Sequence, residues 1–278
     1  MSNLSNPFNL TLPDLETKAR KLRRHVINMI STAGSGHPGG SLSAADIVTA
    51  LYFSVMRHDP GDPRNPQRDR FILSKGHAAP ILYAALAESG YFPLEELSTL
   101  RKLDSRLQGH TDRNLTPGVE MSAGSLGQGL SFGIGMALAG KLDARNYHVY
   151  VLLGDGECDE GQVWEAAMAA AHFKVDNLTA IVDYNKIQLD GHCCDIMALA
   201  SLTDKWMAFN WHAIEINGHD LKQILFALKK HEDIKDKPTV IIANTIKGKG
   251  VSFMENNVDF HGKAPNFDET IKALKELE

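Results

Sequence analysis

Three shortages in the sequence each exclude a class of protein. The chain has 278 residues but only three cysteines, Cys158, Cys193 and Cys194. An odd count with two cysteines adjacent does not build a disulfide framework, so a reducing cytoplasm is the expected location. The longest uncharged stretch of interest, 126–140, is too short and too rich in glycine to span a membrane. We therefore predict a cytoplasmic protein with no membrane partner.

Clusters of basic residues are also scarce. The net charge is −5, and the only short run of Lys and Arg lies at 18–24. Leu15, Leu22 and Val26 fall at helical spacing around it, so we interpret this run as the solvated face of a helix. Nucleic acid is therefore not an expected partner. The composition, 43% hydrophobic and 23% charged, is typical of a globular protein, and we expect a single domain over residues 1–278.

Apolar segments alternate with helical patterns in the second half of the chain. The pattern predicts strands at 148–153, 178–185, 212–218 and 239–245, and helices at 161–173, 201–210 and 220–231. The first half predicts helices at 14–31, 43–56 and 126–142, a strand, turn and helix within 70–90, and irregular chain at 57–69 and 101–125. Continuous apolar strands separated by helices indicate an α/β fold with a parallel sheet covered on both faces.

The acidic segment after the strand at 148–153 carries the strongest chemical signal. Gly154-Asp155-Gly156 ends that strand, and Asn185 follows the next strand thirty residues later. One βαβ unit brings such strand ends together, so a carboxylate, an amide oxygen and the backbone carbonyl of Ile187 are candidate ligands for Mg²⁺ or a similar ion. The alternative is an ordinary strand-to-helix turn whose acidic side chains are solvated.

Several motifs together make the chain similar to a known family. The run from Gly154 to Asn185 resembles the thiamine diphosphate motif, and the chain resembles the N-terminal domain of transketolase. The matching segments, in the family's order, are "GSGHPGGSLSAADI", "ILSKGHAAP", "QGH", "GSLGQGLSFGIGMALA", "INGHD", "TIKGKG" and "HGKAP". They span nearly the whole chain and imply a thiamine diphosphate-binding, PP-type fold.

The resemblance also implies a role for individual residues. The implied metal ligands are Asp155, Asn185 and the carbonyl of Ile187, for Mg²⁺, Ca²⁺ or Mn²⁺. The implied cofactor-binding residues are His77, Gly124, Leu126, Asp155, Gly156, Glu157, Asn185, Lys247 and His261. The implied catalytic residues are His37, His110 and His261, and Glu160 is implied at a dimer interface. Lys247 stands where full-length members usually have an apolar residue, and the alternative for it is a solvated surface lysine.

The other histidines have no implied role in the site, and we expect their side chains only to make hydrogen bonds with the local structure. They are His25, His58, His148, His172, His192, His212, His219 and His231.

The activity implied is the transfer of a two-carbon ketol unit from a ketose phosphate to an aldose phosphate, as in the pentose phosphate pathway. The pyrimidine-binding and C-terminal domains of the family are absent from this sequence. We therefore expect a separately encoded C-terminal partner subunit, with two copies of each chain. The open alternatives are a truncated form of a longer chain, a non-standard branched or sulfonated sugar, another thiamine diphosphate enzyme such as a 2-oxo-acid dehydrogenase component, and a non-catalytic cofactor-binding subunit.

Overall fold

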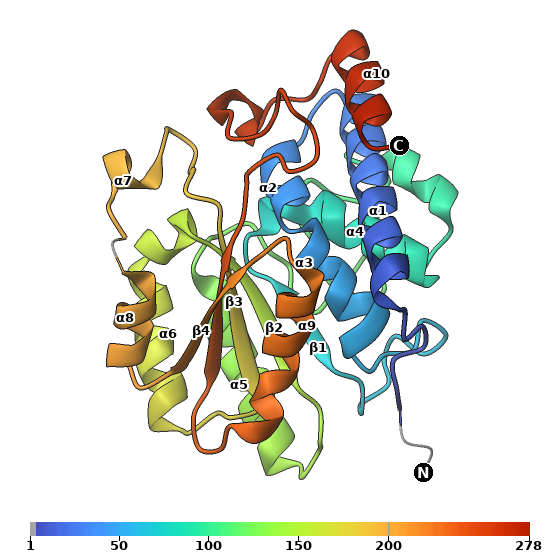
Figure 1. Cartoon of the computed structure of the whole chain (residues 1–278). Helices are drawn as coiled ribbons and strands as arrows, with labels where there is room; N and C mark the ends of the chain where they lie inside the picture. Colours follow the sequence, from blue (N-terminus) through green and yellow to red (C-terminus); the bar gives the residue numbers. More distant parts are fainter. Residues whose placement is uncertain (1–3, 200) are drawn as a thin grey trace.

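The computed structural model describes residues 4–199 and 201–278, and it is built around one five-stranded sheet (Figure 1). The strands are β1 (Arg70–Leu73), β2 (Val149–Gly154), β3 (Leu178–Tyr184), β4 (His212–Asn217) and β5 (Thr239–Asn244). Every neighbouring pair is parallel, and the order across the sheet is β1-β2-β3-β5-β4. The predicted α/β fold is confirmed, with β5 inserted between β3 and β4.

Two hydrophobic cores cover the two faces of the sheet. Because successive strand residues point to opposite faces, Val149 and Val151 belong to one core and Tyr150 and Leu152 to the other. The helices of the first core are α5 (Gln128–Leu142), α6 (Gly161–His172) and α8 (Leu202–Ala208). Those of the second core are α1 (Leu12–Ala33), α2 (Pro38–Ser43), α3 (Ala45–Ala50), α4 (Ala79–Ser89), α9 (Leu221–Lys229) and α10 (Phe267–Glu276).

The first helix follows the predicted pattern with one exception. The predicted apolar positions of α1 are buried, and Gly34 ends the helix in the left-handed conformation with φ of 61°. Arg23, however, is not part of a solvated face. It is buried and makes a bidentate ion pair with Asp46, at 2.9 and 2.7 Å. The local pattern missed this because the partner lies on another helix.

Two predicted helices differ from those observed. The predicted run at 43–56 divides into the end of α2, then α3, and then a π-helix at Leu51–Val55. Helical spacing within 161–173 predicts a face of Trp164, Ala167, Met168 and Ala171. In α6 the buried face is rotated from it, since Met168 is 53% exposed and Val163 and Ala170 are buried. Short helices that the patterns did not predict lie at Leu94–Thr99, Cys193–Ile196 (α7) and Val258–His261.

The glycines of α5 allow this helix to lie directly on the sheet. A Cβ at Gly129 would stand 2.3 Å from Oγ of Ser74, and one at Gly133 would stand 2.5 Å from Cγ2 of Val151. The missing side chains at these positions therefore let the helix backbone lie close to the sheet. Among the described residues, no helix combines the length and the apolar character needed to cross a bilayer.

Candidate functional site

The carboxyl ends of β2, β3 and β5 meet at one edge of the sheet. Gly154 pairs with Asp183, and Asp183 pairs with Ala243. Asp155 and Asn185 therefore leave neighbouring strands side by side, as the spacing predicts. They line a cavity of about 180 Å³ together with other predicted and unpredicted residues. Its lining also includes Gly40, Lys75, His77, Leu126, Gly154, Gly156, Glu157, Ile187, Gln188, Leu189, Lys247 and His261.

Asp155 is a buried carboxylate without an ion-pair partner among the described residues. It is 2% exposed, and its oxygens accept hydrogen bonds from the backbone N–H groups of Gly156, at 2.8 Å, and Lys186. Burial and the nearby charge of Asp183 raise the pKa of Asp155 to about 6. A cation bound here would lower that pKa, because an opposite charge favours the ionised form.

The chain after Asn185 turns sharply to bring a third oxygen to the cavity. Lys186 has a left-handed φ of 68°, and the turn places the carbonyl of Ile187 2.6 Å from Nζ of Lys247. The amide oxygen of Asn185 accepts only a longer, 3.2 Å bond from the N–H of Ile187. Three oxygen ligands of the kind Mg²⁺ prefers thus line one cavity.

Lys247 is a buried lysine, so its interpretation as a solvated surface charge is wrong. It is 2% exposed, and Nζ lies 2.8 Å from Nδ1 of His261. Burial lowers the pKa of Lys247 to about 8, against the opposing effect of Asp155. Lys249, two residues further on, does reach solvent and lies 3.3 Å from Glu255.

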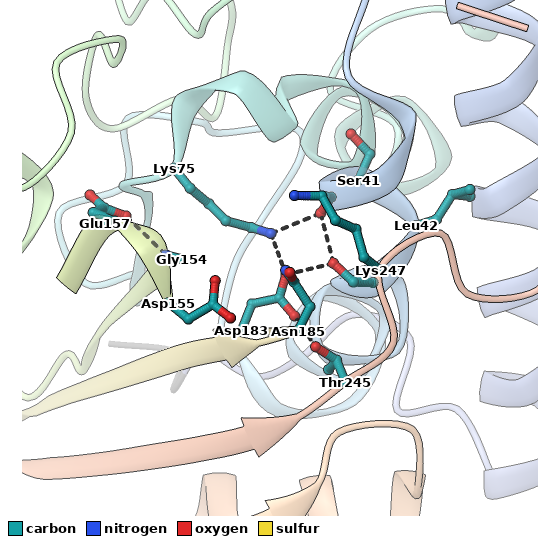
Figure 2. Close-up of polar contacts among 12 residues, drawn as sticks. Ser41, Leu42, Lys75, Gly154, Asp155, Glu157, Asp183, Asn185, Thr245 and Lys247 are labelled. Atoms are coloured by element: carbon teal, nitrogen blue, oxygen red, sulfur yellow. Dashed lines mark hydrogen bonds and ion pairs between the residues drawn. The ribbon is translucent and has the colours of Figure 1, made fainter. Parts of the chain in front are cut away.

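A buried ion pair beneath the cavity was missed by the sequence patterns. Lys75 and Asp183 are 1% and 0% exposed in their side chains, and they are in direct contact (Figure 2). Asp183 also accepts bonds from Ser43, at 2.6 Å, from Thr245, and from Nδ2 of Asn185, at 3.2 Å. Burial opposes its ionisation, but Lys75 and these donors outweigh burial and lower the pKa of Asp183.

This pair holds three strand ends in register around the cavity. Lys75 follows β1, Asp183 belongs to β3, and Thr245 follows β5. Nζ of Lys75 donates a second bond, of 2.8 Å, to the carbonyl of Gly40 in α2. The available signal was a lysine two residues after the apolar strand β1, but this position does not reveal that the charge is buried.

The acidic segment divides into inward and outward residues. Glu157 is buried, and its carboxylate accepts bonds from Ser74 and from the N–H groups of Gly127 and Gly154, both at 2.9 Å. Burial raises the pKa of Glu157 against the effect of these donors. It therefore ties the end of β2 to the start of α5 while also lining the cavity. Glu160 is exposed at the N-terminus of α6 and is not part of the cavity wall.

Four histidines from separate segments converge beside the cavity. The ring of His37 lies 5.3 Å from that of His77, 5.5 Å from that of His261 and 6.4 Å from that of His110, measured between centroids. Burial and nearby cations lower the pKa of His37 to about 4 and that of His261 to about 3. The pKa of His77 is also lowered, chiefly by burial, and so is that of His110. All four rings are therefore neutral at pH 7.

The remaining predicted residues lie at the margin of the cavity. Leu126 is half-buried on its wall, whereas Gly124, with φ of 145°, is exposed beside the ring of His110. His37 and His110 are close to the cavity but are not part of its wall. His219 has a structural contact of the kind expected for a histidine outside the site. Its Nδ1 lies 2.7 Å from the carboxylate of Asp46, and its Nε2 lies 2.8 Å from the backbone nitrogen of Ile246.

The chemistry of the cavity fits a divalent cation and an anionic phosphate group. Within the described part of the chain, no cluster of three or more His, Cys, Asp or Glu side chains is placed to hold a metal. The predicted metal ligands do not require such a cluster, because they are a carboxylate, a side-chain amide and a backbone carbonyl. Gly156 leaves room that a Cβ would fill, 2.9 Å from Cβ of Gln188. The cavity is smaller than the roughly 300–1,000 Å³ of typical small-molecule pockets, so these residues enclose only part of a large cofactor.

Comparisons with known proteins agree with this geometry. A family model described as the thiamine diphosphate binding domain of transketolase matches residues 16–277. A 6-deoxy-6-sulfo-D-fructose transketolase subunit from Clostridium sp. (strain MSTE9) is 46% identical over 95% of this chain and 96% of that protein. One of the subunits of an apulose-4-phosphate transketolase, from Actinobacillus succinogenes, is 46% identical over 98% of this chain and 99% of that protein.

Comparison with a solved transketolase structure shows that the two folds are alike. The transketolase of Campylobacter jejuni superimposes with a TM-score of 0.90 at 33% identity, over 96% of this chain. The chain spans 43% of the length of that protein.

Proposed function

Because the chain belongs to the transketolase family, as its thiamine diphosphate-binding domain, we propose that it is the cofactor-anchoring subunit of a two-subunit transketolase. The observation that carries this proposal is the cavity, where Asp155, Asn185 and the carbonyl of Ile187 meet beside four neutral histidines. The remaining pyrimidine-binding and C-terminal domains would belong to a separately encoded partner in an assembly of two copies of each chain. Two relatives of similar length to this chain are named as subunits, which supports that division.

The proposed ligands of a Mg²⁺, Mn²⁺ or Ca²⁺ ion are Asp155, Asn185 and Ile187. Gly156 would admit the diphosphate through its lack of a side chain, while its N–H already donates to Asp155. Lys247 and His77 would neutralise and bind phosphate oxygens, and Leu126 and Gly124 would border the organic part of the cofactor. Glu160, exposed at the N-terminus of α6, would contact the second copy of the assembly.

Thiamine diphosphate, when bound, would supply carbanion stabilisation. The chain's own residues bind and orient the cofactor and move protons on the sugar hydroxyls. Neutral imidazoles suit this task because each has one donor and one acceptor nitrogen. In His261, Nδ1 faces the ammonium of Lys247, which has only protons to donate, so its own proton lies on Nε2. His37 and His110 complete the proposed set of sugar-contacting residues.

The proposed reaction moves a two-carbon ketol unit from a ketose phosphate to an aldose phosphate in the cytoplasm. The two subunit relatives are equally similar to this chain, and their names specify different sugars, so identity does not select the sugar. A panel of ketose phosphates, a sulfonated ketose and a branched ketose phosphate therefore belongs in the assay with the partner subunit. Ketol transfer that requires both chains is expected, and turnover by this chain alone would contradict the two-subunit proposal.

The cofactor site is tested by calorimetric titration of thiamine diphosphate with and without Mg²⁺. Asp155→Asn keeps the size of the side chain but removes its charge, so Mg²⁺-dependent binding should weaken by about 100-fold or more, in the range of a lost buried charge contact. Asp159→Asn is the matched control, because Asp159 is an exposed acid of the same segment. Equal binding by wild type and Asp155→Asn would overturn the metal assignment.

A further inference from the structure

Arg101 is a cation placed beside the histidine cluster without a carboxylate to balance it. Among residues 4–199 and 201–278, no Asp or Glu oxygen lies within 4.0 Å of its guanidinium nitrogens. One guanidinium nitrogen, Nη1, donates a 2.7 Å bond to Oγ of Ser35. Arg101 is half-buried, so this uncompensated charge is only partly solvated.

The backbone around Arg101 is built to hold that side chain in place. Arg101 has a left-handed φ of 60°, which is costly for a residue with a Cβ, and its N–H donates a 2.8 Å bond to the carbonyl of Leu107. The guanidinium lies against Gly109, where an added Cβ would stand 3.0 Å from Nε and 3.2 Å from Nη2. A side chain at position 109 would therefore have to displace the guanidinium of Arg101.

The position of Arg101 also brings the guanidinium next to the ring of His37. The second guanidinium nitrogen of Arg101, Nη2, lies 3.5 Å from Nδ1 of His37. A guanidinium has donors and no acceptor, so Nδ1 faces it as the acceptor nitrogen and the proton of the neutral ring is placed on Nε2. The opposite edge of the ring borders Gly262, where a Cβ would stand 3.5 Å from Nε2, next to the ring of His261.

We propose that Arg101 is a positioning residue that fixes the proton of neutral His37 on Nε2, so that His37 donates a hydrogen bond to the bound sugar and accepts no proton from it. The part that concerns the sugar rests on the proposed transketolase function, whereas the protonation of His37 does not. Proton acceptance then falls to His110, whose ring nitrogens have no hydrogen-bond partner among the described residues.

Among the described residues, the surroundings of His37 contain cations and neutral rings but no acid that faces it. The groups that face it are the guanidinium of Arg101, the ammonium of Lys247, and the rings of His77, His110 and His261. A positive charge on His37 would be repelled by both cations, which keeps the ring neutral over the pH range where the enzyme would work.

Nitrogen-15 NMR of the imidazoles tests this proposal on the chain itself, with His37→Gln to assign the signals. In the wild type, His37 should show the shift pair of a single Nε2–H tautomer at pH 7. Arg101→Met removes the charge and the donor, so the pair should move to the averaged values of exchanging tautomers and the titration midpoint should rise. Lys102→Met removes an exposed neighbouring cation and should change neither the shift pair of His37 nor its titration midpoint.

Two further variants separate positioning from folding. Arg101→Lys keeps the charge but not the planar fork, so it should restore the titration midpoint without restoring the single tautomer. Ser35→Ala removes the 2.7 Å anchor alone and should produce a partial loss of the single tautomer in a folded chain. If Arg101→Met changes the NMR signals of all four histidines or unfolds the chain, Ser35→Ala decides whether Arg101 fixes the tautomer of His37.

Activity with the partner subunit supplies a second measurement. Arg101→Met should raise KM for the ketose about tenfold with a smaller effect on kcat, as for the loss of one oriented hydrogen bond. A proton on Nδ1 of His37 in the wild type, or identical His37 signals in wild type, Arg101→Met and Ser35→Ala, would overturn the proposal. Absence of ketol transfer in the wild type would instead remove the proposed function and leave the NMR result intact.

Discussion

Replacing Lys75 with Met should destabilise the chain strongly, because it leaves Asp183 as an unpaired buried charge. The two side chains are 1% and 0% exposed, so solvent does not replace the lost ammonium. Breaking a buried ion pair by removing one partner costs about 3–5 kcal/mol. With an unfolding entropy of roughly 2.1 cal/mol/K per residue, a chain of 278 residues should lose about 5–9 °C in Tm.

The pH dependence of this loss of stability follows from the direction in which the pKa of Asp183 is shifted. In the wild type its pKa is lowered, so its contribution to stability is present above an unfolded pKa of about 3.9 and is lost as pH falls through the folded value. In Lys75→Met, burial acts without the cation and raises that pKa, so the folded variant gains stability by taking up a proton. The difference in free energy of unfolding between wild type and variant should therefore be larger at pH 8 than at pH 5.

Urea unfolding followed by circular dichroism at both pH values measures this difference. The matched control is Lys222→Met, which removes an exposed lysine from α9 and should change stability by less than about 0.5 kcal/mol. The double variant Lys75→Met/Asp183→Asn removes the charge that the single variant leaves unpaired and should recover part of the loss. A single variant that loses less than about 1 kcal/mol, or a double variant no more stable than the single one, would refute the reasoning.

Two other predictions concern the stability of the chain. Burial lowers the pKa values of both His148 and His231, and the ring of His231, with centroids 3.7 Å apart, lowers that of His148 further. Stability should therefore fall as pH drops through the unfolded histidine value of about 6.5. His148→Gln should reduce that fall in a urea titration at pH 8 and pH 5, and an unchanged slope would contradict it. Gly133→Ala places a methyl group 2.5 Å from Val151 and should lower the free energy of unfolding, derived from Tm, by about 1–3 kcal/mol. Gly135→Ala, where an added Cβ has no atom within 4 Å, should be neutral or stabilising. Equal effects of the two variants would contradict the packing argument.

The sequence predicted the parts of the fold and site that depend on local pattern. Continuous apolar strands between helical segments indicated the parallel sheet. Because parallel strands end at the same edge, the interval between Asp155 and Asn185 was enough to predict that these residues lie side by side. The resemblance to transketolase placed His77 and His261 near them, and the cavity contains all four residues.

The parts that were missed depend on contacts between distant segments. Lys75 and Asp183 are 108 residues apart, and each alone resembles an ordinary polar residue at a strand end. The burial of Lys247 also follows from tertiary structure, because it is covered only when the segment after β5 packs against α2, where the N–H of Gly248 bonds the carbonyl of Gly39 at 3.0 Å. The order of β4 and β5 is likewise not apparent from the local pattern, because β5 follows β4 in the chain but lies between β3 and β4 in the sheet.

Two charged residues on the cavity wall, Asp155 and Lys247, lack an ion-pair partner among the described residues. The pKa of Asp155 is raised and that of Lys247 is lowered, so each charge is held in a less favourable state than it would have in water. The deeper pair, Lys75 and Asp183, shows that the fold can place a cation directly on a buried carboxylate where it serves structure alone. Asp155 has no such partner among the described residues, although Lys247 lies on the same cavity wall and contacts Ile187 instead. A divalent ion between Asp155, Asn185 and Ile187, with phosphate oxygens toward Lys247, would satisfy both charges at once, and the proposed cofactor brings these two groups together.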